Sequence, residues 1–345
     1  MSGAINLTPT WVASLETNMR KIVATDFERL STDAAAKFSC FAKEVPSLSM
    51  KEQFMWVIDT AFMDYTDKYG GTVEFQELQM AYHEFENSAV ATGYEINRFK
   101  LEDLDGGGVS MAAEYARQMA FKAAYWPVQQ VLKAVNNGHL ATSLTYDGLP
   151  FFSASHLLNP INAATGTYSN LIAAKPIDRT NAATLDIAFN NLCDVVASIE
   201  TFKNPDGLTP RNLKIKGIAV PPALRGRAVQ LTNAKFIAQA VGSAGGSGDI
   251  EAVVSNWGFG QPYVFPELGA AFGGSDTSYY IMIEDAGTST VGAIGYSNRE
   301  PFRVVYNGEM TDADLSRANK LQWVLRARNN TFYMHPYLLI KVNAT

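Results

Sequence analysis

Three residues that could form a hydrolase triad lie within ten positions of one another. Asp147, Ser153 and His156 supply a carboxylate, a hydroxyl and an imidazole, the set of groups that activates a nucleophilic serine. No nucleophile-elbow pattern of glycines surrounds Ser153. We therefore interpret His156 as a structural residue that makes a hydrogen bond within a hairpin, and we keep a Ser/His hydrolase as the alternative from another functional class.

A glycine-rich stretch, GSAGGSG at residues 242–248, is the second candidate for chemistry. A phosphate-binding P-loop needs a Lys and then a Ser or Thr at its end, but Asp249 and Ile250 follow here. We therefore interpret the stretch as a surface loop.

The residues that could bind a metal are scattered along the chain. None of the histidines has a second histidine four residues away, and the two cysteines lie far apart; metal-binding helices and zinc sites need closer spacing. The sequence predicts no metal, no cofactor, no disulfide and no catalytic residue. The residues concerned are Cys40, His83, His139, His156, Cys193 and His335.

The charge balance also limits the class of protein. The chain has 28 basic and 34 acidic residues, whereas strong DNA binding needs a cationic excess that neutralises phosphates. Two pairs of arginines, 225 with 227 and 326 with 328, could contact phosphates or form salt bridges between subunits. No signal peptide and no long apolar run is found, so we expect neither secretion nor a membrane span.

The elements that would carry these residues follow from hydrophobic periodicity. Helices are predicted from Pro9 to beyond Leu30, over residues 109–136 and over residues 184–202, with a short one after Pro222. The second has alanines at spacings of four, which permits close approach of another element. Pro127 should kink or divide it.

Strands are predicted mostly in the last third of the chain. They cover residues 213–220, 279–283, 291–296, 302–306, 321–328 and 331–342, and Pro336 should place the last at an edge or interrupt it. Earlier, residues 73–82 and 94–101 form a long hairpin around a turn at Asn87 and Ser88. The hairpin has too few apolar residues for a core of its own, so we expect it and the N-terminal helix to need partners outside the subunit.

Several segments, in order, resemble the Mu-like phage major head subunit family, whose fold is the Hong Kong 97 type. They are residues 7–15 (LTPTWVASL), 45–47 (VPS) with the following Phe54 to Trp56, 94–103 (YEINRFKLED), 146–156, 213–224 (LKIKGIAVPPAL) and 295–302 (GYSNREPF). The chain departs from the family where a proline is expected after His156 and at the glycine-rich stretch.

The resemblance implies an α+β capsid fold in four parts. These are an N-terminal arm and lead-in (residues 1–70), an extended loop (71–104), a peripheral domain with a long spine helix (105–145 and 297–345) and an axial domain (146–296). Residues of the arm and loop should contact neighbouring subunits: Trp11, Leu15, Met19, Tyr82, Phe85, Tyr94, Ile96, Arg98, Phe99 and Lys100.

The function implied is that of a major capsid protein of a tailed bacteriophage or prophage. Hexamers and pentamers would form an icosahedral shell around double-stranded DNA, which the subunit contacts weakly and without sequence preference. Further partners would be a scaffold or protease, a portal and decoration proteins. The protein would reside in the virion after assembly in the cytoplasm of a bacterial host. An encapsulin-like compartment is the alternative within the same fold.

Overall fold

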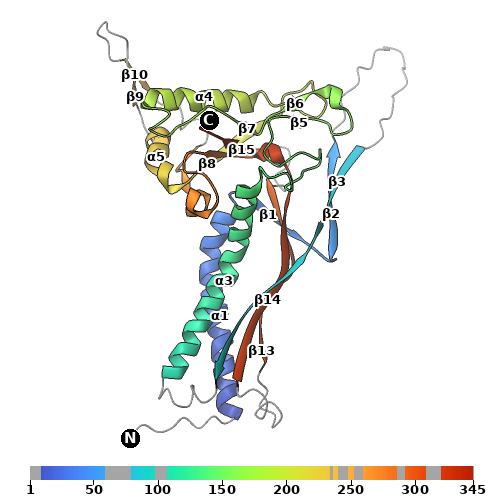
Figure 1. Ribbon diagram of the computed structural model, residues 1–345, viewed down its shortest axis with the longest axis vertical. Coiled ribbons are helices and arrows are strands. Elements are labelled where there is room, and N and C mark those ends of the chain that lie inside the picture. Colours follow the sequence, from blue (N-terminus) through green and yellow to red (C-terminus); the bar gives the residue numbers. More distant parts are fainter. Residues whose placement is uncertain are drawn as a thin grey trace, which may run out of the picture. The chain divides into compact units, whose positions relative to one another are not determined.

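A computed structural model describes residues 9–58, 79–97, 107–233, 236–239, 248–251, 259–285, 292–307 and 320–344 (Figure 1). It combines helices and sheets, so the predicted α+β class is confirmed. The chain forms two compact units, each built from three segments. Unit 1 comprises Met1–Glu52, Glu86–Val131 and Tyr296–Thr331, and unit 2 comprises Gln53–Phe85, Leu132–Gly295 and Phe332–Thr345.

Two long helices belong largely to unit 1. Helix α1 spans Pro9–Phe38 and helix α3 spans Gly107–Asn137. The alanine row of α3 is buried, as close packing requires. Pro127 lies inside a continuous α3 and does not divide it; the other predicted effect, a kink, stays a prediction.

A four-stranded sheet packs with these helices. Its order is β1 (Ala42–Pro46), β13 (Ile294–Asn307), β14 (Lys320–Tyr333) and β4 (Ser88–Asn97). The core of unit 1 is a single cluster that α1, α3, β4 and β14 share: Leu15, Met19, Val23, Ile96, Ala112, Ala116, Met119, Ala120, Ala123, Leu321, Trp323 and Leu325. The N-terminal helix therefore finds its apolar surface within its own chain, and the expectation that it needs an outside partner is wrong.

The predicted hairpin at Asn87 is also absent from the described residues. Strand β3 (Gln79–Glu86) pairs with β2 (Lys51–Ile58), whereas β4 pairs antiparallel with β14 from Ser88–Asn329 to Asn97–Lys320. Asn87 is buried between these strands, and its amide donates to Ser47 Oγ at 2.8 Å and accepts from Ser297 Oγ at 2.7 Å. Asn87, which we interpreted as part of a turn, is thus a buried residue between β3 and β4, where the chain passes from one sheet to another. We call it the buried joint.

Unit 2 contains a five-stranded sheet. Its order is β11 (Tyr263–Val264), β8 (Leu213–Val220), β12 (Tyr279–Asp285), β15 (Leu339–Val342) and β7 (Leu171–Ile172). The predicted interruption is confirmed, because β14 ends at Tyr333 and Pro336–Leu338 form a 3-10 turn before β15. Strand β15 is nevertheless internal, between β12 and β7, so the prediction of an edge strand does not apply to it.

Helices accompany this sheet, and two small sheets complete the described elements. Helix α4 spans Leu185–Glu200 with Thr184 as N-cap, and α5 spans Arg225–Asn233 after a 3-10 turn at Pro222–Leu224. Both agree with the predicted helices. The small sheets pair β5 (His156–Leu157) with β6 (Thr167–Tyr168) and β9 (Phe236–Gln239) with β10 (Gly248–Glu251). The remaining 3-10 turns are Ala163–Thr165, Pro266–Leu268 and Ala270–Phe272.

The four predicted domains stay a prediction. The two contact units divide the chain differently: the whole proposed axial segment except Tyr296 falls in unit 2, together with the C-terminal strand β15. The proposed extended loop lies partly at residues 71–78 and 98–104, which are outside the described residues.

Candidate functional site

The candidate triad does not assemble around Ser153. His156 is fully buried, and its Nδ1 lies 2.8 Å from Asp147 Oδ2 while its Nε2 lies 3.1 Å from the carbonyl oxygen of Phe151. Ser153 Oγ instead accepts a hydrogen bond from the amide of Ser155 at 3.3 Å. Because both imidazole nitrogens are engaged elsewhere, the interpretation of His156 as a structural residue is confirmed.

Asp147 organises this loop. Its Oδ1 accepts from Thr145 Oγ1 at 2.7 Å and from the amide of Leu149 at 3.1 Å, and Oδ2 accepts from the amide of Leu157 at 3.1 Å in addition to His156. Burial by itself raises the pKa of Asp147, but the hydrogen bonds and charge of His156, with those from Thr145 and Leu149, outweigh burial and lower the pKa below its ordinary value. The carboxylate is therefore a structural anion.

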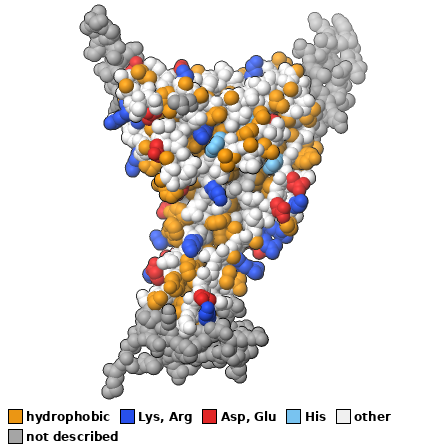
Figure 2. All heavy atoms as spheres, in the orientation of Figure 1, with side chains coloured by type: hydrophobic (Ala, Val, Ile, Leu, Met, Phe, Trp, Pro, Cys, Tyr) orange, Lys and Arg blue, Asp and Glu red, His pale blue; other side chains and the backbone are white. Residues whose placement is uncertain are grey.

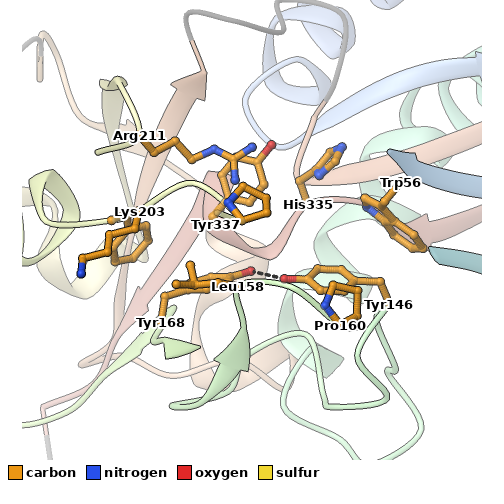
Figure 3. A pocket seen from close by; sticks show the side chains of 11 residues that line it. Trp56, Tyr146, Leu158, Pro160, Tyr168, Lys203, Arg211, His335 and Tyr337 are labelled. Atoms are coloured by element: carbon orange, nitrogen blue, oxygen red, sulfur yellow. Dashed lines mark hydrogen bonds between the residues drawn. The ribbon is translucent and has the colours of Figure 1, made fainter. Parts of the chain in front are cut away.

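A small aromatic pocket lies next to this loop in unit 2. Its walls include Trp56, Tyr146, Tyr168, Arg211 and Tyr337, and its volume is about 60 Å³. Figure 3 shows the hydroxyl groups of Tyr146 and Tyr168 directed at each other, 3.1 Å apart, with the Arg211 side chain over Tyr337. The guanidinium lies 3.6 Å from that ring centroid and bonds Asp285 at 3.2 Å. A volume of this size holds about two water molecules.

His335 also lines this pocket. Burial, with a smaller contribution from the charge of Arg211, lowers the pKa of His335 to about 3, although Asp285 opposes the shift. Burial likewise raises the pKa of Tyr146 well above its ordinary value. His335 and Tyr146 are thus held in their neutral forms, next to the ion pair of Arg211 with Asp285.

No cluster of three or more His, Cys, Asp or Glu side chains suited to a metal occurs among the described residues. His139 Nδ1 lies 2.8 Å from the carbonyl oxygen of Asn136, and burial lowers the pKa of His83. Cys40 and Cys193 form no disulfide. Residues 242–247 of the glycine-rich stretch are outside the described part of the chain, so their interpretation as a surface loop stays a prediction.

One of the four arginines, Arg227, has a role different from the one expected. Arg227 is buried and donates to the carbonyl oxygens of Ile177, Ala182 and Ala183 at 3.3, 2.6 and 3.2 Å. It therefore holds backbone of its own subunit, and the expectation that it contacts phosphate or another subunit is wrong. Arg328 on β14 is exposed and pairs with Glu300 at 3.5 Å.

The residues proposed for contacts between subunits divide into three groups. Four are buried in their own chain: Leu15, Met19, Phe85 and Ile96. Tyr94 is half-buried and stacks on Tyr115, with 5.1 Å between ring centroids. Phe85 stacks on Phe332 at 3.9 Å. The premise that these side chains lack partners within the subunit is wrong, because β14 and the helices supply them.

The second and third groups are the exposed and the undescribed residues. Tyr82 on β3 is 66% exposed. Arg98, Phe99 and Lys100 lie outside the described residues, and for Trp11 only the backbone, in α1, is described. Contacts of these residues with other subunits stay predictions.

Several exposed apolar side chains were not anticipated from the sequence. Leu48, Met50, Met55 and Met80 lie close in sequence to the buried positions of β1, β2 and β3 but face outward. The exposed side of β2 that carries Met55 also carries Lys51 and Gln53, and the exposed side of β3 also carries two glutamates, so alternation alone does not single out these apolar side chains. No helix of the described residues is long and apolar enough to span a membrane.

Comparison with solved structures finds phage capsids among the similar chains. With the procapsid of bacteriophage JBD30 the identity is 13% and the TM-score 0.47, covering 98% of this chain and 76% of the other. With the capsid of cyanophage P-SCSP1u the identity is 13% and the TM-score 0.49, covering 88% and 86%. With the virus-like particle from Pyrococcus furiosus the identity is 9% and the TM-score 0.47, covering 95% and 98%. With TM-scores below 0.5, these likenesses alone assign nothing.

A search of curated proteins finds no match. The model of the family described as Mu-like prophage major head subunit gpT matches residues 16–186, about half of the 345-residue chain. The match includes most of α1, the strands β1 to β4, helix α3 and the loop that holds Asp147 and His156. It therefore spans segments on which the sequence resemblance rests, and over these residues the chain belongs to the Mu-like prophage major head subunit gpT family.

Proposed function

We propose that this chain, a phage major head subunit by its family, assembles through hexamers and pentamers into an icosahedral shell that encloses double-stranded DNA. The family match over residues 16–186 is the observation that carries the proposal. The family is one of structural capsid proteins, and the loop most suggestive of catalysis has both imidazole nitrogens of His156 committed to structural partners.

The exposed apolar surface supports a role in assembly. Met55 on β2 and Met80 and Tyr82 on β3 are 57%, 48% and 66% exposed, although these strands pair with each other. A two-stranded sheet has little burial of its own, and several large exposed apolar side chains on one such small sheet are consistent with an interaction surface. Figure 2 shows further hydrophobic side chains over helices α1 and α3.

The other partners belong to the same proposal. We infer that a scaffold or protease, a portal and decoration proteins act with the shell, and that assembly takes place in the bacterial cytoplasm before the protein is found in the virion. The net charge of −6 supports weak contact with the packaged DNA rather than tight binding. We expect the dissociation constant of the free subunit for duplex DNA to be larger than about 10⁻⁶ M at physiological salt.

Sedimentation and electron microscopy of the purified protein test the proposal. We expect capsomers or shells, alone or with the scaffold co-expressed. Replacing Met55, Met80 and Tyr82 together by Gln should weaken assembly and leave the helical circular dichroism unchanged, because these side chains are exposed. A species of 37.7 kDa in every salt and with scaffold present would refute the proposal. Shells that enclose a protein cargo and no DNA would identify the encapsulin-like alternative.

A further inference from the structure

An exposed leucine stands on a turn that the chain holds rigidly. Leu48 lies between β1 and β2 and is 94% exposed. The turn around it is fixed by Glu52, whose Oε1 accepts from Ser47 Oγ and from the amides of Leu48 and Ser49, each at 2.8 Å. One carboxylate oxygen thus collects three donors, which holds the Leu48 backbone in one position.

The buried joint at Asn87 holds the turn from its other side. Asn87 Nδ2 donates to Ser47 Oγ at 2.8 Å and to the carbonyl oxygen of Ser49 at 2.9 Å. The backbone amide of Asn87 donates to the carbonyl oxygen of Met50 at 2.9 Å. A large apolar side chain on a fixed backbone loses little conformational freedom when it enters a partner, and such pre-organised side chains are suited to anchor an interface.

A groove in the same unit has the complementary properties. It lies among α1, α3, β1 and β13 and has a volume of about 210 Å³. Most of the side chains that line it are apolar, including Ala34, Ala35, Phe38 and Phe302. Cavities of about 150 Å³ with such walls hold a benzene molecule, so the groove has room for the side chain of a leucine. Its lining includes Glu44, which accepts a hydrogen bond from Asn298 at 2.7 Å. The turn of Leu48 continues into Lys51, which is exposed and opposite in charge to Glu44.

We propose that Leu48 of one subunit inserts into this groove of a second copy of the chain. Leu48 does not fill the groove of its own subunit, because it is almost completely exposed. The anchor and the groove are different patches of one chain, so the contact is head-to-tail, and head-to-tail contacts generate closed rings when the rotation closes. The inference rests on the proposed function and names one contact through which its hexamers and pentamers form.

Two substitutions test the contact from its two sides. Leu48→Asp places a charge where an apolar side chain is buried in the assembly, and Ala35→Trp fills the groove from an exposed position on α1. Each should raise the concentration needed for assembly roughly tenfold to a hundredfold and leave the unfolding curve of the subunit unchanged. Leu208→Asp is the matched control, since Leu208 is a leucine 77% exposed on a turn of unit 2; it should assemble as the wild type does.

Cysteine pairing tests the same contact independently of shell formation. In a Cys193→Ser background, chains with Leu48→Cys are mixed with chains with Ala35→Cys under mild oxidation. A disulfide-linked dimer that forms from the mixture but not from either variant alone would support the inference. The inference is overturned if the mixture gives no such dimer, or if Leu48→Asp assembles like the wild type.

The two proposals can fail separately. If the wild type forms shells while the mixed cysteine variants give no dimer, the proposed function stands and this contact is wrong. If the wild type forms no shell under any condition and the mixed variants still cross-link, the contact is real and the proposed shell is wrong.

Discussion

The buried pair of Asp147 and His156 gives the sharpest prediction of stability. Both side chains are completely inaccessible to solvent, and the carboxylate accepts four hydrogen bonds, from His156, Thr145, Leu149 and Leu157. Asp147→Ala removes the acceptor for all four donors at once. Each buried donor left without a partner costs about 1–3 kcal/mol, and the four costs overlap because the groups form one network.

We therefore expect Asp147→Ala to lower the free energy of unfolding by about 3–5 kcal/mol, less than the sum of four independent losses of about 1–3 kcal/mol each. Asp206→Ala is the matched control. Asp206 accepts from the amides of Leu208 and Thr209 at 2.8 and 3.0 Å and from Thr209 Oγ1 at 2.7 Å, so the pattern of the turn is similar but exposed. Its loss should cost only about 0.5–1.5 kcal/mol.

Urea unfolding of both variants at one protein concentration, followed by far-ultraviolet circular dichroism, provides the measurement, since assembly adds concentration-dependent stability. The pH dependence gives a second test. Because the pKa of Asp147 is lowered in the folded protein, its stabilisation is present above the ordinary carboxyl pKa and is lost as pH falls through the lower folded value. Equal effects of the two substitutions, or a gap that persists at the lowest pH, would refute the reasoning.

Three further predictions concern packing and pH. Gly295→Ala should destabilise the protein by about 1–3 kcal/mol, since the added Cβ would lie 2.3 Å from Phe332 Cζ. Gly226→Ala in α5 should be neutral or stabilising, because no atom lies within 4 Å of the added Cβ. Thermal unfolding of the two variants tests this difference. Ala116→Leu should cost about 1–3 kcal/mol by overpacking the core of unit 1, and an unchanged urea midpoint would contradict this. His335→Phe should remove part of the fall in stability between pH 7 and 5: because the folded pKa of His335 is about 3, the unfolded chain binds the proton first and stability falls as pH drops through 6.5. A variant with the wild-type slope, measured by urea unfolding at both pH values, would disprove this role.

The sequence predicts single elements well and their partners poorly. Periodicity gave β8 at its observed bounds and α4 within two residues of its observed ends, because both depend on a local pattern. It could not show that β4 pairs with β14 more than 200 residues away. Alternation indicates that a strand exists but not which strand it pairs with. Asn87 is a residue type common in turns, but here its side-chain amide is buried and bonds Ser47 and Ser297.

The candidate sites show the same division. The structural role of His156 followed from sequence because its partners lie within ten residues. The burial of Arg227 did not, since Ile177 and Ala182 approach it from a distant segment. The fixed turn of Leu48 is local to Glu52, yet nothing in residue type reveals that this leucine faces solvent.

The position of β4 at the edge of its sheet has a consequence for handling the protein. Among the described elements only β14 pairs with it, so one row of its main-chain groups can accept another strand. Charged side chains and prolines usually block the addition of a strand to an edge. Residues 88–93 (SAVATG) have neither. Subunits accumulating faster than they find their proper neighbours should therefore aggregate through this edge, and the yield of soluble protein should depend on the rate of synthesis as much as on folding stability.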